Sequence, residues 1–395
     1  MLDIIRYRAE TPGVRYVTHF NNAGSSLPPA KVLHTMIDHL EDEAFKGGYE
    51  AAKDASDKLD NTYQAVAKLI NAETDEIAIL ENATRAWTMA FYGIKFADGD
   101  RILTSVAEYA SNYIAFLQMQ KHVAIEIDVV PNDEHGQLDV DALRDMMDER
   151  VRLIAISHVP TQNGLVQPAT EIGRIAAEYD ALYLLDACQS VGQMPIDVEA
   201  IGCHMLSATG RKYLRGPRGI GFLYVKRDII PQLEPPVLDL HSATWQSATE
   251  YTLAPDATRF ENWEMNIAAK IGLGVAVDYA LSVGIEAIQE RVTQLADTMR
   301  QKLADIDRVT VHDVGVNQCG IVTFSVEGMS AEDVSAELRA TYNINTSVSP
   351  RTYAILDFSR RNLDSVVRSS VHYYNTDAEI DQLCEALVKI MKSDS

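Results

Sequence analysis

The stretch Ala181-Leu182-Tyr183-Leu184-Leu185 is a continuous apolar run that ends in the polar segment Asp186-Ala187-Cys188-Gln189. A run of this kind is typical of a strand that is covered on both faces. Further along the chain comes Ser207-Ala208-Thr209-Gly210-Arg211-Lys212-Tyr213, a turn of small residues that presents a lysine. The interval between Asp186 and Lys212 leaves room for a helix or loop and one more strand. Both side chains are therefore expected at the same edge of a parallel sheet.

The combination of Lys212 with Asp186 indicates a particular cofactor chemistry. A lysine amine can condense with an aldehyde, and a carboxylate can hold a proton on a ring nitrogen. These are the two groups that an enzyme dependent on pyridoxal 5′-phosphate requires. Taken singly, Asp186 could instead cap a helix, and Lys212 could be a surface lysine.

Strand and helix signals alternate over most of the chain. Apolar runs predict strands at 77–80, 101–104, 125–130, 153–157, 181–185 and 221–225, with helical windows such as 139–147 and 169–179 between them. This alternation predicts an α/β fold with a mostly parallel sheet between helices. A helix over 268–303 then leads into a smaller α+β unit, with strands near 309–312, 320–325, 345–348 and 366–371. We therefore predict a large domain over 16–265 and a small domain formed by 1–15 and 266–395.

Composition restricts the possible partners. The 395 residues are 47% hydrophobic and 23% charged, as in an ordinary globular protein. No apolar run approaches the ~18 residues of a membrane-spanning helix, and the N-terminus lacks a secretory signal, so a cytoplasmic location without a membrane partner is expected. The formal net charge of −22 argues against nucleic acid. The four cysteines are scattered without metal-ligand spacing, so no metal site is predicted.

Polar residues follow other predicted strands, at the edge where ligands of open α/β sheets collect. Ala83 and Thr84 open a helix whose N–H groups can bind a phosphate, although a plain helix cap would have the same sequence. Tyr109 can lay its ring on a planar cofactor or pack in the core. Thr161 can reach the cofactor or a substrate, or belong to an ordinary turn.

From about Phe20 to Leu387 the chain resembles the class V aminotransferase family of fold-type I pyridoxal-phosphate enzymes. Asp186-Ala187-Cys188-Gln189 and Thr209-Gly210-Arg211-Lys212 carry this resemblance. It implies that Lys212 bonds the cofactor aldehyde and then moves the substrate Cα proton, that Asp186 pairs with the ring nitrogen, and that Tyr109 stacks on the ring. These three are the expected catalytic residues. The expected cofactor-binding residues are Ala83, Thr84, Tyr109, Thr161, Asp186, Gln189, Thr209, Arg211 and Lys212.

The same resemblance implies how substrate is bound and how subunits assemble. Arg368 matches the arginine that binds the substrate α-carboxylate, and Asn22 matches a segment at the substrate mouth. Such enzymes are typically homodimers whose sites borrow from the partner, and Trp263 and Glu264 lie in the segment expected to be lent.

The family includes cysteine desulfurases, cystine C–S lyases, isopenicillin-N-epimerase-like proteins and ergothioneine-pathway sulfoxide lyases. Desulfurases carry a nucleophilic cysteine in a small-domain loop, and the matching stretch 345–353 has none. The segments 47–51, 157–161 and 259–264 look most like the sulfoxide-lyase and epimerase-like branch, in which Tyr49 and Arg351 would touch the distal part of the substrate. We therefore predict a lyase that β-eliminates sulfur from an S-substituted or sulfoxide cysteine, releasing pyruvate and ammonia. An epimerase or aminotransferase is the alternative; a desulfurase or a non-catalytic interaction protein ranks lower.

Overall fold

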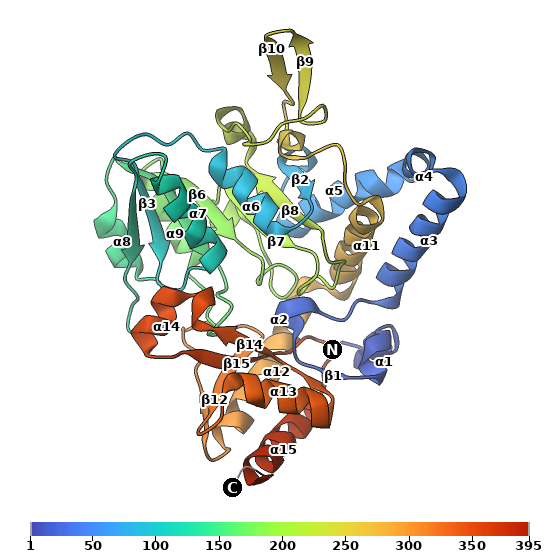
Figure 1. The fold of residues 1–395 in the computed structure, drawn as a ribbon, viewed down its shortest axis with the longest axis vertical. Helices are drawn as coiled ribbons and strands as arrows, with labels where there is room; N and C mark the ends of the chain where they lie inside the picture. The colour runs from blue at the N-terminus through green and yellow to red at the C-terminus, as the bar shows by residue number, and fades with distance from the viewer. Residues whose placement is uncertain (1, 394–395) are drawn as a thin grey trace.

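The computed structural model describes residues 2–393, and the side chains of residues 2–392. Its centre is a seven-stranded sheet with strand order β2-β8-β7-β6-β5-β3-β4 (Figure 1). These strands are β2 (Ile77–Leu80), β3 (Arg101–Ser105), β4 (Glu126–Val130), β5 (Val151–Ser157), β6 (Leu182–Asp186), β7 (Met205–Thr209) and β8 (Gly221–Val225). Strand β8 runs antiparallel to β2 and β7, and the other neighbours pair in parallel. The predicted α/β fold with a mostly parallel sheet is confirmed.

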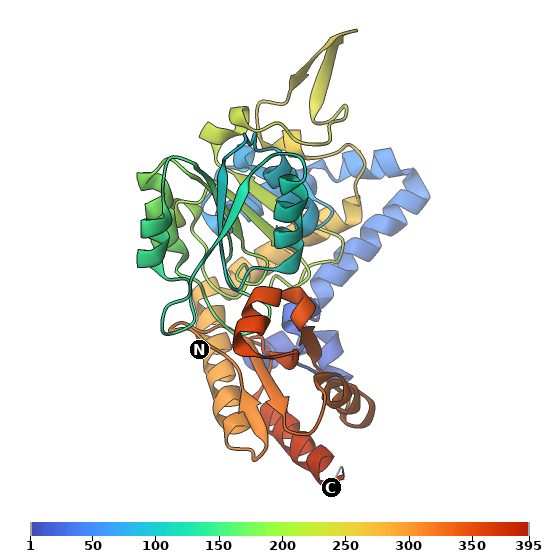
Figure 2. The same ribbon diagram turned by 60° about the vertical axis from the view of Figure 1, so that its left-hand side comes forward.

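Helices cover both faces of this sheet (Figure 2). They are α5 (Ser56–Ile70), α6 (Ala83–Tyr92), α7 (Ala110–Gln120), α8 (Val140–Met146), α9 (Ala169–Glu178) and α11 (Ile267–Val283). Because side chains alternate along a strand, each strand contributes to two separate cores. On one face, Leu184 shares a cluster with Trp87 of α6 and Phe116 of α7. On the other face, Leu185 shares a cluster with Ile172 of α9. This double burial explains the continuous apolar runs in the sequence.

The loops that carry the predicted site residues leave the sheet at one edge. Strands β3, β5, β6 and β7 run parallel and end there, and β8 begins beside the ends of β2 and β7. Gly221 stands where these three strands meet. A Cβ atom on Gly221 would lie 2.5 Å from the carbonyl oxygen of Ala208 and 2.9 Å from the amide nitrogen of Ala83. The missing side chain therefore lets α6 begin directly beside β7.

A smaller unit lies below the large one in Figure 1. Its antiparallel sheet has the order β11-β12-β15-β14, formed by β11 (Val309–Val311), β12 (Ile321–Val326), β15 (Ser365–Ser370) and β14 (Ser347–Pro350). Helices α12 (Ile285–Ala304) and α13 (Ala331–Tyr342) pack on this sheet, and α15 (Asp377–Ser393) packs on both helices. The N-terminal strand β1 (Thr18–His19) pairs in parallel with β13 (Ile344–Asn345) and so joins this unit.

Shorter elements complete the chain, including a hairpin that projects from the top of Figure 1. The hairpin is β9 (Ala243–Ser247) with β10 (Glu250–Leu253). The other helices are α1 (Ile4–Ala9), α2 (Asn22–Ser25), α3 (Ala30–Lys46), α4 (Gly48–Asp54), α10 (Val198–Ile201) and α14 (Ile355–Arg361). The 3-10 helices are η1 (Pro12–Arg15), η2 (Thr74–Glu76), η3 (Arg227–Gln232), η4 (Ala257–Phe260) and η5 (Arg351–Tyr353).

The helix predicted over 268–303 is in fact two helices, α11 and α12. The chain turns at Gly284, whose φ of +94° is open to glycine but strained for other residues. The two helices meet at an angle of 78°. Within residues 2–393 no single helix is long and apolar enough to cross a membrane, and α11 and α12 reach that composition only as a bent pair. Helix α11 packs on α3 and α5, beside the large sheet, and the domain boundary at residue 265 stays a prediction.

Candidate active site

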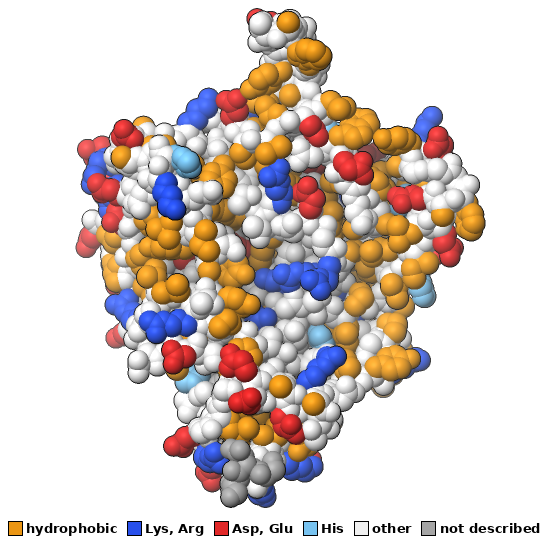
Figure 3. Space-filling view, in the orientation of Figure 1, with side chains coloured by type: hydrophobic (Ala, Val, Ile, Leu, Met, Phe, Trp, Pro, Cys, Tyr) orange, Lys and Arg blue, Asp and Glu red, His pale blue; other side chains and the backbone are white. Residues whose placement is uncertain are grey.

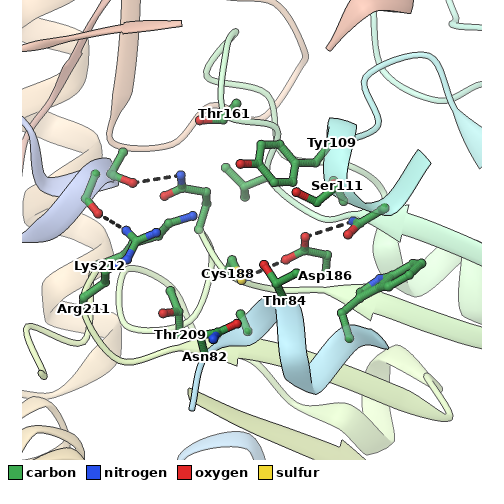
Figure 4. Close-up of a pocket in the computed structure, with 18 of the residues that line it drawn as sticks. Asn82, Thr84, Tyr109, Ser111, Thr161, Asp186, Cys188, Thr209, Arg211 and Lys212 are labelled. Atoms are coloured by element: carbon green, nitrogen blue, oxygen red, sulfur yellow. Dashed lines mark hydrogen bonds between the residues drawn. The ribbon is translucent and has the colours of Figure 1, made fainter. Parts of the chain in front are cut away.

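A cavity of about 400 Å³ opens at the edge of the large sheet where the strands end. Figure 4 shows Lys212 and Arg211 on one side of it, Asp186 on the other, Tyr109 and Thr161 above, and Thr84 and Thr209 below. Ten of the predicted site residues line this cavity: Ala83, Thr84, Tyr109, Thr161, Asp186, Gln189, Thr209, Arg211, Lys212 and Arg368. The strand-end argument therefore identified one common site.

Lys212 enters the cavity from the loop after β7. Among the described residues, no side chain or backbone group forms a hydrogen bond or ion pair with its Nζ atom. Burial, together with the charges of Arg211 and Arg368, lowers the pKa of Lys212 to about 8, and Cys188 and Asp186 oppose this shift. About a tenth of the amine is therefore neutral at pH 7, and the neutral amine is the form that attacks an aldehyde.

Asp186 is the last residue of β6, and its carboxylate is held from two sides. The backbone N–H of Cys188 donates to Oδ1 (3.0 Å), and the side-chain amide of Asn112 donates to Oδ2 (3.1 Å). These donors fix the orientation of the carboxylate while it still faces the cavity. A carboxylate held in this way can keep a proton on a cofactor ring nitrogen.

The lower end of the cavity can accept a phosphate. Asn82 caps α6, with its side chain accepting the N–H of Arg85 (2.9 Å), and Ala83 and Thr84 of the first turn line the cavity. Unpaired N–H groups and the helix dipole favour an anion at this position. The guanidinium of Arg211 lies at the same cavity and donates to the carbonyl of Gly24.

Tyr109 and Gln189 complete the fit to the cofactor. Tyr109 precedes α7, and burial raises the pKa of its hydroxyl, so the ring stays neutral at physiological pH. Gln189 donates from Nε2 to the carbonyl of Ala23 (3.0 Å), whereas its buried Oε1 atom has no partner among the described residues. An acceptor without a partner at this cavity matches a ring hydroxyl that needs one. The residues present therefore fit pyridoxal phosphate.

Arg368 reaches the cavity from β15 of the smaller unit. Its guanidinium donates to the hydroxyl of Thr161 and, through Nε, to the hydroxyl of Ser347 (3.0 Å). Burial lowers the pKa of Arg368 to about 10, so the side chain remains charged at neutral pH. A buried guanidinium whose described partners are neutral hydroxyls can bind a carboxylate through two parallel hydrogen bonds.

Other predicted substrate contacts lie elsewhere. Asn22 is fully buried, donates to the carbonyl of Ser370 (2.7 Å) and accepts from the hydroxyl of Tyr374. Its side chain does not line the cavity within one chain, and its contact with the substrate stays a prediction. Its neighbours Ala23 and Gly24 line the cavity instead. Arg351 is exposed and donates to Ser359 (2.8 Å) outside the cavity.

Tyr49, Trp263 and Glu264 line a second cavity of about 500 Å³. Within one chain Tyr49 therefore does not reach the site, because α4 lies at the outer end of α3, away from the large sheet (Figure 1). The predicted contribution of Trp263 and Glu264 to a partner's site stays a prediction.

Sequence reasoning missed several lining residues, among them Ser111, Asn112 and Tyr353. Asn112 lies in the first turn of α7, three positions after Tyr109, and this helical spacing could have suggested it. Tyr353 belongs to η5 of the smaller unit, and only the tertiary fold brings it to the cavity.

Because one cavity offers Lys212 to an aldehyde and Asp186 to a ring nitrogen at the edge of this sheet, the chain is a pyridoxal-phosphate-dependent enzyme of fold type I. Residues 18–383 match the family described as Aminotransferase class-V, and the chain belongs to this family. A relative from Methanothermobacter thermautotrophicus, named a probable cysteine desulfurase, is 32% identical over 97% of both chains.

Solved structures agree with this assignment. The apo cysteine desulfurase from Thermococcus onnurineus superimposes with a TM-score of 0.91 at 25% identity, covering 100% of this chain and 99% of that one. A C-DES variant with glycine covalently linked to its pyridoxal-phosphate cofactor has the same fold, with a TM-score of 0.86 at 22% identity over 96% and 98% of the two chains.

These relatives correct the predicted reaction. A lyase acting on S-substituted or sulfoxide cysteines was expected, with desulfurase ranked lower. This ranking is wrong, because the relatives from Methanothermobacter thermautotrophicus and Thermococcus onnurineus are named cysteine desulfurases. The expectation gave decisive weight to a missing loop cysteine. The segment 345–353 indeed has no thiol, but it forms β14 and η5 and delivers Tyr353 to the cavity.

Proposed function

We propose that this chain removes the sulfur atom from L-cysteine and leaves L-alanine, as a cysteine desulfurase does, with a thiol from solvent as the sulfur acceptor. The observation that supports this proposal most directly is that Lys212, Asp186 and Arg368 line the same cavity. When bound, pyridoxal phosphate supplies the electron sink that stabilises a carbanion at the substrate Cα. The names of the relatives support cysteine as the substrate.

Arg368, Lys212 and Asp186 have separate roles in this reaction. Arg368 binds the α-carboxylate and orients the substrate, and the Lys212 amine takes the Cα proton and later returns a proton. Asp186 holds the proton on the ring nitrogen. In the overall reaction the Cβ–S bond of cysteine breaks, an S–S bond to the acceptor forms, and the acceptor's thiol hydrogen ends on alanine. A thiol R–SH and cysteine thus give R–S–SH and alanine.

The acceptor is assigned to solvent because the chain offers a poor one. Cys188 is the one cysteine among the residues that line the cavity. Burial, reinforced by Asp186, raises the pKa of its thiol well above the ordinary value, so it stays protonated and weakly nucleophilic at neutral pH. A thiol that enters through the open side of the cavity avoids this limitation.

The test is to incubate the holoenzyme with L-cysteine and dithiothreitol and to quantify alanine, sulfide and pyruvate. We expect alanine and sulfide in equal amounts, at a rate that rises with the dithiothreitol concentration and is abolished in Lys212→Ala. Cys188→Ala should retain the reaction. Pyruvate in place of alanine, or no product from cysteine, would refute the proposal.

We also propose that the chain acts as a homodimer. Three apolar side chains of α3, Leu33, Ile37 and Leu40, are between 42% and 49% exposed, and Tyr49 and Trp263 beside them are also exposed. Figure 3 shows hydrophobic side chains along the flank formed by α3. A second copy would cover this surface, as expected for an extended apolar patch. Ile37→Asp should convert a dimer to monomers in analytical ultracentrifugation, and a monomeric unmodified protein at micromolar concentration would contradict the proposal.

A further inference from the structure

Glu108 is a buried carboxylate that lies just behind the cavity, in the loop between β3 and α7. It is 3% exposed and accepts five hydrogen bonds. Its Oε1 atom accepts from the backbone N–H of Tyr109 (2.8 Å), the amide of Asn112 (2.9 Å) and the hydroxyl of Ser157 (2.6 Å). Its Oε2 atom accepts from the hydroxyl of Thr104 (3.0 Å) and the backbone N–H of Ser157 (3.1 Å).

Three of these five donors are N–H groups, which cannot accept a hydrogen bond, whereas the hydroxyls of Ser157 and Thr104 can donate or accept. Burial raises the pKa of Glu108, whereas the hydrogen bonds from Ser157, Asn112 and the Tyr109 N–H favour the charged form. The ionised form satisfies all five hydrogen bonds. The three N–H groups, which can only donate, therefore favour a negative charge at this site.

Asn112 connects this charge to the catalytic carboxylate. Its side-chain NH₂ group has two hydrogens, and it donates to Glu108 at 2.9 Å and to Asp186 at 3.1 Å. A single amide thus joins two carboxylates. The backbone N–H of Cys188 donates to the other oxygen of Asp186, so Asn112 and the Cys188 segment together fix the orientation of this carboxylate.

We propose that Glu108 is a positioning residue that acts through Asn112 to hold Asp186 against the cofactor's ring nitrogen and to keep that nitrogen protonated. Two effects combine. The hydrogen-bonded relay fixes the direction of the Asp186 carboxylate, and the charge of Glu108 adds to the negative potential that favours a protonated ring. The proposal concerns the cofactor's protonation and does not depend on which amino acid the enzyme converts.

Glu108→Gln tests the charge, because glutamine keeps the shape but turns one acceptor into an NH₂ group that meets the donors of Ser157 or Asn112. With cofactor labelled by ¹⁵N in the ring, the nitrogen resonance should move from the protonated toward the unprotonated range. We expect kcat to fall ~10–100-fold while KM changes less than about threefold, because only transition-state stabilisation is lost.

Asn112→Ala removes the amide that joins Glu108 to Asp186 and leaves Glu108 with its four other donors. This variant therefore tests the proposal even if Glu108→Gln does not fold. The same ¹⁵N displacement is expected. The matched control is Glu76→Gln, another buried glutamate that accepts backbone N–H groups, from Glu73 (3.0 Å) and Arg227 (2.8 Å), far from the cavity. It should change stability without moving the resonance. A ring nitrogen that stays protonated in Asn112→Ala, or a fall in kcat without a ¹⁵N change, would overturn the proposal.

Discussion

Tyr109 and Tyr353 meet edge to face across the mouth of the active-site cavity, with ring centroids 6.4 Å apart and ring planes at 68°. Tyr109 precedes α7 of the large unit, whereas Tyr353 ends η5 of the smaller unit. The two units therefore share an aromatic rim over the site. A movement of the smaller unit relative to the large unit would change the distance between the two rings, because each ring belongs to a different unit.

The first prediction concerns this rim. Replacing Tyr353 by Ala should raise KM for the amino acid several-fold with a smaller effect on kcat, because this side chain shapes the mouth of the cavity and forms no hydrogen bond with Lys212 or Asp186 among the described residues. Tyr353→Phe should behave like the unmodified enzyme. Steady-state kinetics measure both values. Tyr179→Ala is the matched control, since Tyr179 is as exposed as Tyr353, at 42%, but lies at the end of α9. Equal effects of the two Ala variants would count against a role of the rim.

The second prediction follows from the lowered pKa of Lys212. The rate at which cofactor-free enzyme binds pyridoxal phosphate covalently should rise with pH through about 8 and then level off, because the neutral amine is the reacting form. Stopped-flow absorbance records this step. Lys212→Ala should show no covalent phase at any pH, whereas Lys226→Ala, an exposed lysine, should leave the profile unchanged. A rate that is flat through pH 8 would contradict the shift.

The third prediction separates substrate binding from cofactor binding. Arg368→Lys should raise KM for the amino acid ~10–100-fold, because lysine cannot make two parallel hydrogen bonds to a carboxylate. The cofactor absorbance should be unchanged. Arg144→Lys, which alters a surface pair with Glu178, is the control for the substitution itself. Loss of the cofactor band in Arg368→Lys would show that the arginine holds the cofactor instead.

The fourth prediction tests packing behind the sheet. A Cβ atom on Gly173 of α9 would lie 1.8 Å from the carbonyl oxygen of Ile201, so Gly173→Ala must displace backbone. We expect the free energy of unfolding to fall by ~2 kcal/mol, as for other overpacked sites. Gly48→Ala, where a Cβ would meet nothing within 4 Å, should be neutral or slightly stabilising. Denaturant titration compares the two, and equal stability would contradict the expected clash.

Local patterns in the sequence predicted the parts of this protein that depend on local physics. The strands at 77–80 and 221–225 lie where the apolar runs indicated, because a strand buried on both faces needs continuous apolar residues. The cofactor site was predicted for a related reason, since parallel strands present their ends at one edge. Lys212, Asp186 and Thr84 all line the cavity at that edge.

The features that the sequence did not predict depend on contacts between segments that are distant in the chain. Asn22 turns inward because Ser370 and Tyr374, from the other end of the chain, bind its amide, and no local signal indicates this. The break at Gly284 was hidden because a glycine within an apolar helical pattern is often tolerated. The reaction was misjudged because one missing side chain in the segment 345–353 outweighed a resemblance that spans nearly the whole chain.

The pairing of β1 with β13 determines when this molecule can finish folding. Thr18 and His19 leave the ribosome long before their partners Ile344 and Asn345 are made. The ion pair between Arg8 and Glu379 (2.8 Å) joins the two ends still later. The nascent chain must therefore carry the segment around β1 without its native partners while the large unit is made, a period of exposure in which a chaperone could bind it.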